Sequence, residues 1–145
     1  GGESVFLLEK KDKNFNQIVE NFLNKSSEPF ILQKFIPEVK KGDKRVLIIN
    51  GNPVAAVQRI PKNNDIRSNI HVGGTVVKTK LTKNDLKICD AIKEELIKNK
   101  LFFVGIDIIG NYLTEINVTS PTCIQEIKKL SKIDVSRKIW DELLV

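Results

Sequence analysis

The segment from Gly105 to Thr122 reads GIDIIGNYLTEINVTSPT, and it decides the fold. Two apolar runs, 101–109 and 112–118, lie on either side of the pair Gly110-Asn111. Short β-rich runs separated by Gly-Asn are typical of a β-hairpin. The sequence therefore predicts a hairpin at 101–118, with a few polar side chains among apolar ones.

Three polar side chains interrupt this hairpin: Asp107, Glu115 and Asn117. Glu115 and Asn117 are two residues apart, so a strand points both to one face. Carboxylate and amide oxygens suit a hard cation such as Mg²⁺. A two-residue loop would pair Asp107 with Thr114 and turn it away from Glu115, whereas a longer loop or a bulge would set Asp107 opposite Glu115. A half-exposed strand with its polar face in water is the alternative.

Composition limits the classes of function. The 145 residues suit one domain, and 41% of them are hydrophobic, which is enough for a core. The net charge of +6 fits an anionic partner, but scattered lysines and 6% aromatic residues favour a nucleotide over nucleic acid. The sequence shows no membrane-spanning run and no signal peptide. Two cysteines with one histidine form no zinc or disulfide pattern, so we expect a cytoplasmic protein.

A second hairpin is predicted upstream, where Asn50-Gly51 separates β-rich runs at 45–49 and 53–60. Arg45 begins one strand and Arg59 ends the other, so both guanidinium groups come to one end of the hairpin. Guanidinium groups bind phosphate through paired hydrogen bonds. Two solvated arginines at strand ends are the alternative, and the pattern leaves both open.

Further strands and loops are read from apolar runs and breakers. The runs 5–8 and 30–36 predict two more strands, the second stopped by Pro37, and a charged loop follows at 38–44. The polar segment 61–77 has no periodic pattern, and a loop of that length is usually functional. Helices packed on a mostly antiparallel sheet make the fold class α+β.

Two helices are predicted in the first hundred residues. Apolar side chains recur at helical spacing over 14–24, which indicates a helix that packs into the core. Thr82 and Asp85 form a capping-box pattern that opens a helix to about Asn99. Cys89 in this helix is expected to be a small buried hydrophobic residue.

Two more helices are predicted after the central hairpin. Ser120-Pro121-Thr122 places a capping residue before a proline, so we expect a helix to begin there and to bind a carboxylate with its free N–H groups. We expect Cys123, in its first turn, to serve packing. The last helix should run from an Asp134 cap to Leu144, with Val135, Ile139 and Leu143 inward and Trp140 partly so.

The runs VGIDIIG at 104–110 and LTEINVTSPT at 113–122 closely resemble the prokaryotic glutathione synthetases, which are ATP-grasp ligases. The resemblance covers essentially the whole chain. It implies the ATP-grasp fold, with residues 1–145 as the C-terminal part of the ATP-binding domain and a lid loop at 61–77. The chain begins with two glycines and has no Met, which also indicates a piece of a longer protein.

The activity implied by the resemblance joins γ-glutamylcysteine to glycine through an acyl phosphate and releases ADP and phosphate. ATP is the co-substrate and Mg²⁺ or Mn²⁺ the cofactor. The implied partners are small molecules only, without nucleic acid or membrane, and the full-length protein is expected to be a homo-oligomer. Two other readings stay open: another ATP-grasp ligase, such as one that adds glutamate to a protein tail, and a non-enzymatic basic module that binds an acidic partner.

The resemblance also implies roles for individual residues. The metal ligands are Asp107, Glu115 and Asn117, and the catalytic arginines are Arg45, Arg59 and Arg67. The nucleotide-binding residues are Gln33, Lys34, Phe35, Ile36, Asp43 and Asn117. The substrate-binding residues are Asn69, Gly73, Gly74, Ser120, Pro121 and Thr122. Thr75 stands where some relatives carry an arginine, so one cation of the lid is expected to be missing.

Overall fold

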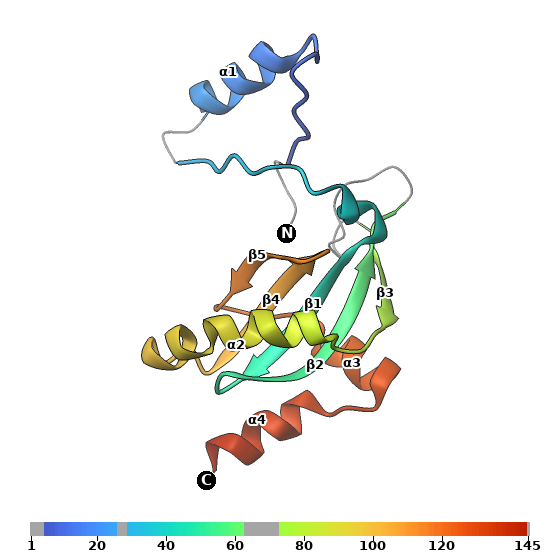
Figure 1. The fold of residues 1–145 in the computed structure, drawn as a ribbon, viewed down its shortest axis with the longest axis vertical. Helices are drawn as coiled ribbons and strands as arrows, with labels where there is room; N and C mark the ends of the chain where they lie inside the picture. Colours follow the sequence, from blue (N-terminus) through green and yellow to red (C-terminus); the bar gives the residue numbers. More distant parts are fainter. Residues whose placement is uncertain (1–4, 26–28, 63–72, 145) are drawn as a thin grey trace.

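A computed structural model describes residues 5–25, 29–62 and 73–144, and the following statements concern those residues. Its sheet has five antiparallel strands in the order β3-β2-β1-β4-β5, and helices accompany it, so the fold is α+β (Figure 1). The strands are β1 (Asp43–Ile49), β2 (Asn52–Ile60), β3 (Thr75–Lys78), β4 (Phe103–Ile109) and β5 (Tyr112–Asn117). The helices are α1 (Phe15–Lys25), the 3₁₀ helix η1 (Pro37–Lys41), α2 (Lys83–Lys98), α3 (Ile124–Ser131) and α4 (Val135–Leu143).

Both faces of the sheet are covered by helices. Each strand contributes side chains to both faces, because successive side chains point to opposite faces. Helix α2 covers one face, and α3 and α4 cover the other (Figure 1). Val46 and Ile48 of β1 pack on the α2 side together with Cys89. Leu47 and Ile49 of the same strand pack on the α3 side. The central strand β1 therefore carries a continuous buried run.

The two predicted hairpins are confirmed. Asn50 and Gly51 both have positive φ, at 47° and 72°, which is the twisted turn that Asn-Gly favours. In the second hairpin Gly110 has φ 58° and the loop has two residues, because Ile109 pairs with Tyr112. The register shifts between Asp107 and Ile108, so Asp107 lies opposite Glu115. The bulge that the metal hypothesis requires is present.

Helix α2 begins as predicted. Thr82 and Asp85 form the full capping box, and Cys89 is buried. The Asp85 carboxylate also accepts a hydrogen bond from Lys44 of β1 at 2.5 Å, which ties the start of α2 to the sheet. Burial acts to raise the pKa of Asp85, but the hydrogen bonds from Lys44 and Thr82 outweigh it and hold that pKa below its ordinary value.

Two predicted strands are wrong. Residues 5–8 and 30–36 form no strand, and both segments are largely exposed, with Ile31 82% and Leu32 75% exposed. An apolar run becomes a strand only where another strand pairs with it, and the five-stranded sheet does not extend to either segment. The segment 38–44 is also no plain loop, because η1 and the first residues of β1 occupy it.

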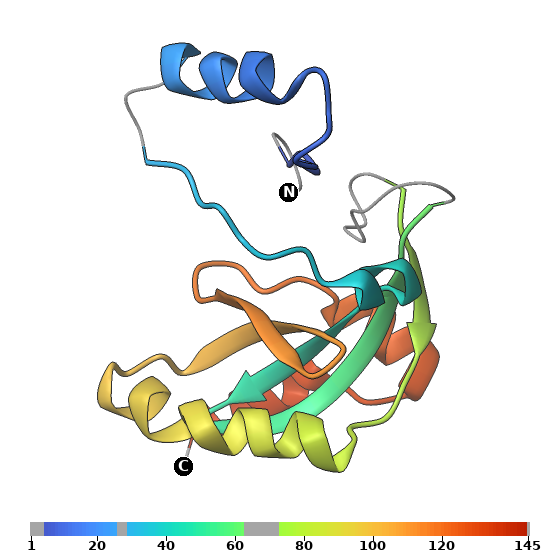
Figure 2. The same cartoon turned by 45° about the horizontal axis from the view of Figure 1, so that its top comes forward.

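Helix α1 forms where predicted, but its apolar stripe does not join the core. The helix lies apart from the sheet in both views (Figures 1 and 2), and Leu23 is 60% exposed. Phe22 packs against Phe6 and Phe30, with ring centroids 5.5 and 5.8 Å apart. The stripe therefore contacts the extended segments on either side of α1.

The helix predicted at Ser120-Pro121-Thr122 begins later. Helix α3 starts at Ile124, after Cys123, which has φ 83° and makes no side-chain cap. A Ser-Pro pattern is compatible with a turn as well as with a helix start. The free N–H groups of α3 therefore do not belong to Ser120 and its neighbours.

Helix α4 is capped by Asp134 as predicted, but its inward face is shorter than expected. Val135 is buried and Ile139 packs on the core, whereas Leu143 and Trp140 are 53% and 62% exposed. The predicted loop 61–77 also ends earlier, because β3 begins at Thr75. Within the described residues, every helix is too short or too polar to cross a membrane.

The Lys44–Asp85 contact generates a pH prediction. Asp85→Asn should lower the free energy of unfolding by about 3 kcal/mol near pH 7, because it breaks a buried ion pair. The pKa of Asp85 is lower in the folded state than in the unfolded state, so its contribution is fully present above about pH 4 and is lost as the pH falls. Urea unfolding should show the difference between wild type and variant shrinking below about pH 4.

Asp90→Asn is the matched control, because Asp90 is exposed on the same helix. That variant should stay within about 0.5 kcal/mol of wild type. A difference between Asp85→Asn and wild type that is unchanged down to pH 3 would contradict the assignment.

Candidate functional site

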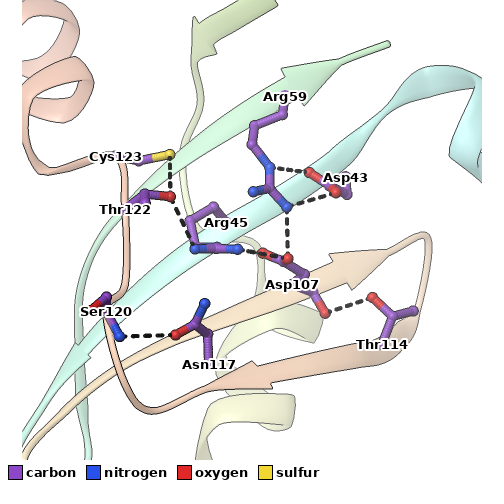
Figure 3. A network of polar contacts seen from close by, with 9 residues as sticks. All are labelled: Asp43, Arg45, Arg59, Asp107, Thr114, Asn117, Ser120, Thr122 and Cys123. Carbon is purple, nitrogen blue, oxygen red and sulfur yellow. Dashed lines mark hydrogen bonds and ion pairs between the residues drawn. The ribbon is translucent and has the colours of Figure 1, made fainter. Parts of the chain in front are cut away.

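Four charged side chains are buried together on three neighbouring strands (Figure 3). They are Asp43 and Arg45 of β1, Arg59 of β2 and Asp107 of β4, and each is at most 8% exposed. Strand pairing brings them together, since Asp43 lies opposite Arg59 and Arg45 opposite Asp107. We call these four residues the charge cluster.

The two arginines share the carboxylate of Asp107. Arg45 donates from Nε to Oδ1 at 2.5 Å and from Nη2 to Oδ2 at 2.8 Å. Arg59 Nη2 lies 2.6 Å from the same Oδ2. Arg59 also donates from Nε and Nη2 to the two oxygens of Asp43, at 2.7 and 2.8 Å. The prediction that Arg45 and Arg59 lie at one end of the hairpin is confirmed, and they are buried rather than solvated.

Two glycines make room for the charge cluster. Gly42 has φ 89°, and a Cβ there would lie 1.9 Å from the carbonyl oxygen of Arg59, so only glycine fits next to that strand. A Cβ on Gly105 would lie 3.2 Å from Cδ of Arg45 and 3.0 Å from Cβ of Pro121. Gly105 therefore lets the Arg45 side chain and the segment after β5 pack across β4.

The charge cluster is electrically balanced, with two carboxylates and two guanidinium groups. Burial alone would lower the pKa of Arg59, but the hydrogen bond with Asp43 and the charge of Asp107 outweigh it and raise that pKa above its ordinary value. Arg59 is therefore a fixed cation. Buried charges persist only when they are paired, so each member of the charge cluster holds the next in place.

The candidate metal ligands share one face of the sheet. Asp107 lies opposite Glu115, and Asn117 lies opposite Gly105 two pairs further on. Glu115 is exposed, and Oδ1 of Asn117 accepts a hydrogen bond from Ser120 N at 3.4 Å. Within the described residues no three Asp, Glu, His or Cys side chains gather as a metal site. Two carboxylates and one amide oxygen nevertheless fit Mg²⁺ by donor type, since it takes oxygen ligands.

The segment after β5 reaches the charge cluster through Thr122. Arg45 Nη1 donates to the Thr122 hydroxyl at 3.4 Å, and Thr122 Oγ1 lies 3.8 Å from the Cys123 sulfur. Burial raises the pKa of the Cys123 thiol, which agrees with a packing role. Of the residues predicted to bind substrate, Ser120, Pro121 and Thr122 therefore lie beside Arg45 and Asn117 in the irregular segment between β5 and α3.

Other predicted site residues are not gathered here. Gln33, Lys34 and Phe35 are exposed on the extended segment that precedes η1, and Ile36 is half-buried there. Both oxygens of Asp43, which is predicted to bind the nucleotide, accept hydrogen bonds from Arg59.

The glycines predicted to bind substrate, Gly73 and Gly74, lie directly before β3. Two further site predictions, Arg67 and Asn69, lie outside the described residues, as does most of the predicted lid.

Comparison with known proteins identifies the family. The chain matches the model of the prokaryotic glutathione synthetase ATP-grasp domain over residues 1–132. The glutathione synthetase of Agrobacterium fabrum is 46% identical over 143 residues, which cover 99% of this chain and 45% of that protein. Those of Synechocystis sp. and Prochlorococcus marinus are each 45% identical and cover 95% and 99% of this chain, against 43% and 47% of the relatives.

The chain belongs to the prokaryotic glutathione synthetase family. The resemblance noted in its central hairpin is thereby confirmed, and so is the ATP-grasp assignment of the fold. The chain spans less than half the length of these curated relatives. It is therefore similar to one part of a glutathione synthetase, and the matched part contains the whole charge cluster.

Sequence reasoning missed two features of this site. It did not foresee that Asp107 of β4, which lies opposite Arg45, would pair with both arginines. It also gave no role to Thr114, which donates its hydroxyl hydrogen bond to the Asp107 carbonyl oxygen at 3.1 Å. Both features depend on the register of the paired strands, which the sequence alone left undecided.

The charge cluster predicts an order of stabilities. Asp107→Asn should lower the free energy of unfolding by about 3–5 kcal/mol, because it leaves two buried guanidinium groups with one carboxylate between them. Asp43→Asn should cost less, since Arg59 keeps its contact with Asp107. Urea unfolding of both variants measures the order, and an equal or reversed order would contradict the central place of Asp107.

Proposed function

We propose that this chain is the part of a glutathione synthetase that neutralises the phosphates and carries the metal ligands. The buried charge cluster supports this, because two fixed guanidinium groups lie on the same sheet face as Asp107, Glu115 and Asn117. A solvent-exposed basic module would not need buried, carboxylate-held arginines. The proposal gives the whole protein the ATP-dependent ligation of γ-glutamylcysteine and glycine.

The proposed reaction has two steps, and negative charge builds up in the first. The cysteinyl carboxylate of γ-glutamylcysteine attacks the γ-phosphorus of ATP, and ADP leaves with the electrons of the broken P–O bond. The glycine amine then attacks the acyl carbon, phosphate leaves, and a proton is released from the nitrogen. Negative charge gathers on phosphate oxygens in the first step, so positioned cations lower its barrier.

Arg45 and Arg59 are suited to this task because they are held before any substrate arrives. Each has its Nε and Nη2 on carboxylates, which fixes the plane of the guanidinium group. A preorganised cation needs little reorganisation when charge develops. Thr122 steadies the remaining Nη1 of Arg45. No side chain of this chain is required as a covalent nucleophile.

Asp107, Glu115 and Asn117 would hold Mg²⁺ or Mn²⁺, whose bound charge offsets that of the phosphates. The segment 120–122 would orient a substrate carboxylate beside Asn117. Segment 61–77, with Arg67, Asn69, Gly73 and Gly74, would serve as the lid on the strength of the family resemblance. Gln33 to Ile36 and Asp43 would serve the nucleotide. The whole protein is proposed to be cytoplasmic and homo-oligomeric.

The metal assignment predicts a shift in Mg²⁺ dependence. In the full-length protein, Glu115→Gln keeps the shape of the side chain and removes its charge, so half-maximal activity should require about tenfold more Mg²⁺. Steady-state phosphate release at varied Mg²⁺ and saturating substrates measures it. Glu142→Gln, on the exposed face of α4, is the control that should behave as wild type. An unchanged titration for Glu115→Gln would exclude Glu115 as a ligand.

The proposal also predicts the behaviour of residues 1–145 alone. The residues assigned to the nucleotide at 33–35 are exposed and form no strand, so this chain alone gives the nucleotide few contacts there. The family resemblance places two phosphate-contacting lysines outside residues 1–145, and the loss of their contacts at about 1.5–3 kcal/mol each would weaken ATP binding by roughly 10²–10⁴-fold. A coupled ADP assay should therefore show no turnover by the isolated chain and turnover by the full-length protein. Turnover by the isolated chain would make it a self-sufficient enzyme and overturn this division.

A further inference from the structure

The register of the β4–β5 hairpin shifts by one residue between its loop and its far end. Its loop has two residues, with Ile109 opposite Tyr112, and Ile108 lies opposite Leu113. If the ladder continued without interruption, Asp107 would face Thr114. Instead, Asp107 faces Glu115, so Thr114 is an extra residue of β5 that has no opposite residue on β4. An extra residue of this kind is a β-bulge.

The bulge decides on which face the candidate metal ligands lie. Without it, Glu115 would pair with Ile106, which is buried in the core on the α2 side. Asn117 would move to that face as well, because a slip of one residue exchanges the faces of a strand. With it, Glu115 and Asn117 share the face of Asp107 and the charge cluster. The composition of the metal site thus depends on one inserted residue.

Thr114 closes the bulge with its own side chain. Its hydroxyl donates to the Asp107 carbonyl oxygen at 3.1 Å, at the point where the ladder is interrupted (Figure 3). The bond joins the extra residue Thr114 to Asp107, the residue that it would face in an uninterrupted ladder. Thr114 is half-buried, so water competes less for this carbonyl than at an open surface.

We propose that Thr114 is a positioning residue whose hydroxyl locks the register of β4 against β5 and thereby sets Glu115 and Asn117 beside Asp107. The metal part of this inference rests on the proposed function, whereas the register part does not. Thr114 does not itself contact the cation. It acts through the backbone of Asp107, so its loss should loosen the metal site and leave the charge cluster paired.

The test uses isotope-labelled residues 1–145 in solution and two readouts. Cross-strand NMR contacts between the backbone protons of residues 107 and 115 report the register without any metal. Titration with Mn²⁺, which broadens the signals of nearby amides, reports the cation at Glu115 and Asn117. The variants are Thr114→Val, which keeps the shape and removes the hydroxyl, and Thr114→Ser, which keeps the hydroxyl. Thr79→Val makes the same change between β3 and α2 and serves as the control.

Thr114→Val should weaken the 107–115 contacts and raise the Mn²⁺ midpoint about three- to tenfold, as expected for one hydrogen bond. Thr114→Ser and Thr79→Val should stay within about twofold of wild type. Wild-type contacts and an unchanged midpoint in Thr114→Val would overturn the proposal. Weakened contacts with an unchanged midpoint would support the register lock and contradict the metal assignment. Absence of Mn²⁺ broadening in the wild type would refute the metal site alone, and the contacts would still decide the lock.

Discussion

Four buried charges on three strands constrain how the central strands of this molecule pair. Asp107 accepts from two guanidinium groups, and Arg59 joins it to Asp43. A buried charge without its partner is costly, so β2, β1 and β4 must pair in the register that completes the set. Gly42 and Gly105 keep the space around it clear. The pairing of the central strands and the arrangement of the arginines therefore depend on each other.

The sequence allowed the local structures to be predicted where each carries its own signal. Asn50-Gly51 and Gly110-Asn111 specify tight turns, and the Thr82–Asp85 box and the Asp134 cap specify helix starts, all of which form. The metal hypothesis also named its structural condition, that Asp107 should face Glu115, and the bulge meets it. The roles of those residues could not be predicted in the same way, because donor types and spacing limit the chemistry but do not by themselves assign a role.

The wrong predictions share a physical cause: a local pattern whose outcome depends on distant partners. The apolar runs 5–8 and 30–36 have strand-like composition, but no strand of the five-stranded sheet pairs with them. The stripe of α1 has helical spacing and yet packs on Phe6 and Phe30 rather than on the sheet. Ser120-Pro121 resembles a helix start, but this segment is irregular and contacts Asn117 and Arg45. Periodicity specifies an amphipathic element and not the surface that it covers.

Under the proposed function, Asp107 takes part both in the charge cluster and in the cation site. Charge balance therefore links the binding of phosphate to the binding of the cation. In the structure its carboxylate neutralises Arg45 and Arg59. Under the proposed function the same carboxylate contributes to a cation site, so a cation that arrives alone would leave excess positive charge among the buried arginines. An anion that arrives alone would compete with Asp107 for the same guanidinium groups. Entry of a cation and phosphate together keeps the buried charges balanced, which favours their binding as one unit over either ion by itself. Under the proposed function, the self-neutralised cluster would therefore favour binding of the cation and the phosphate together.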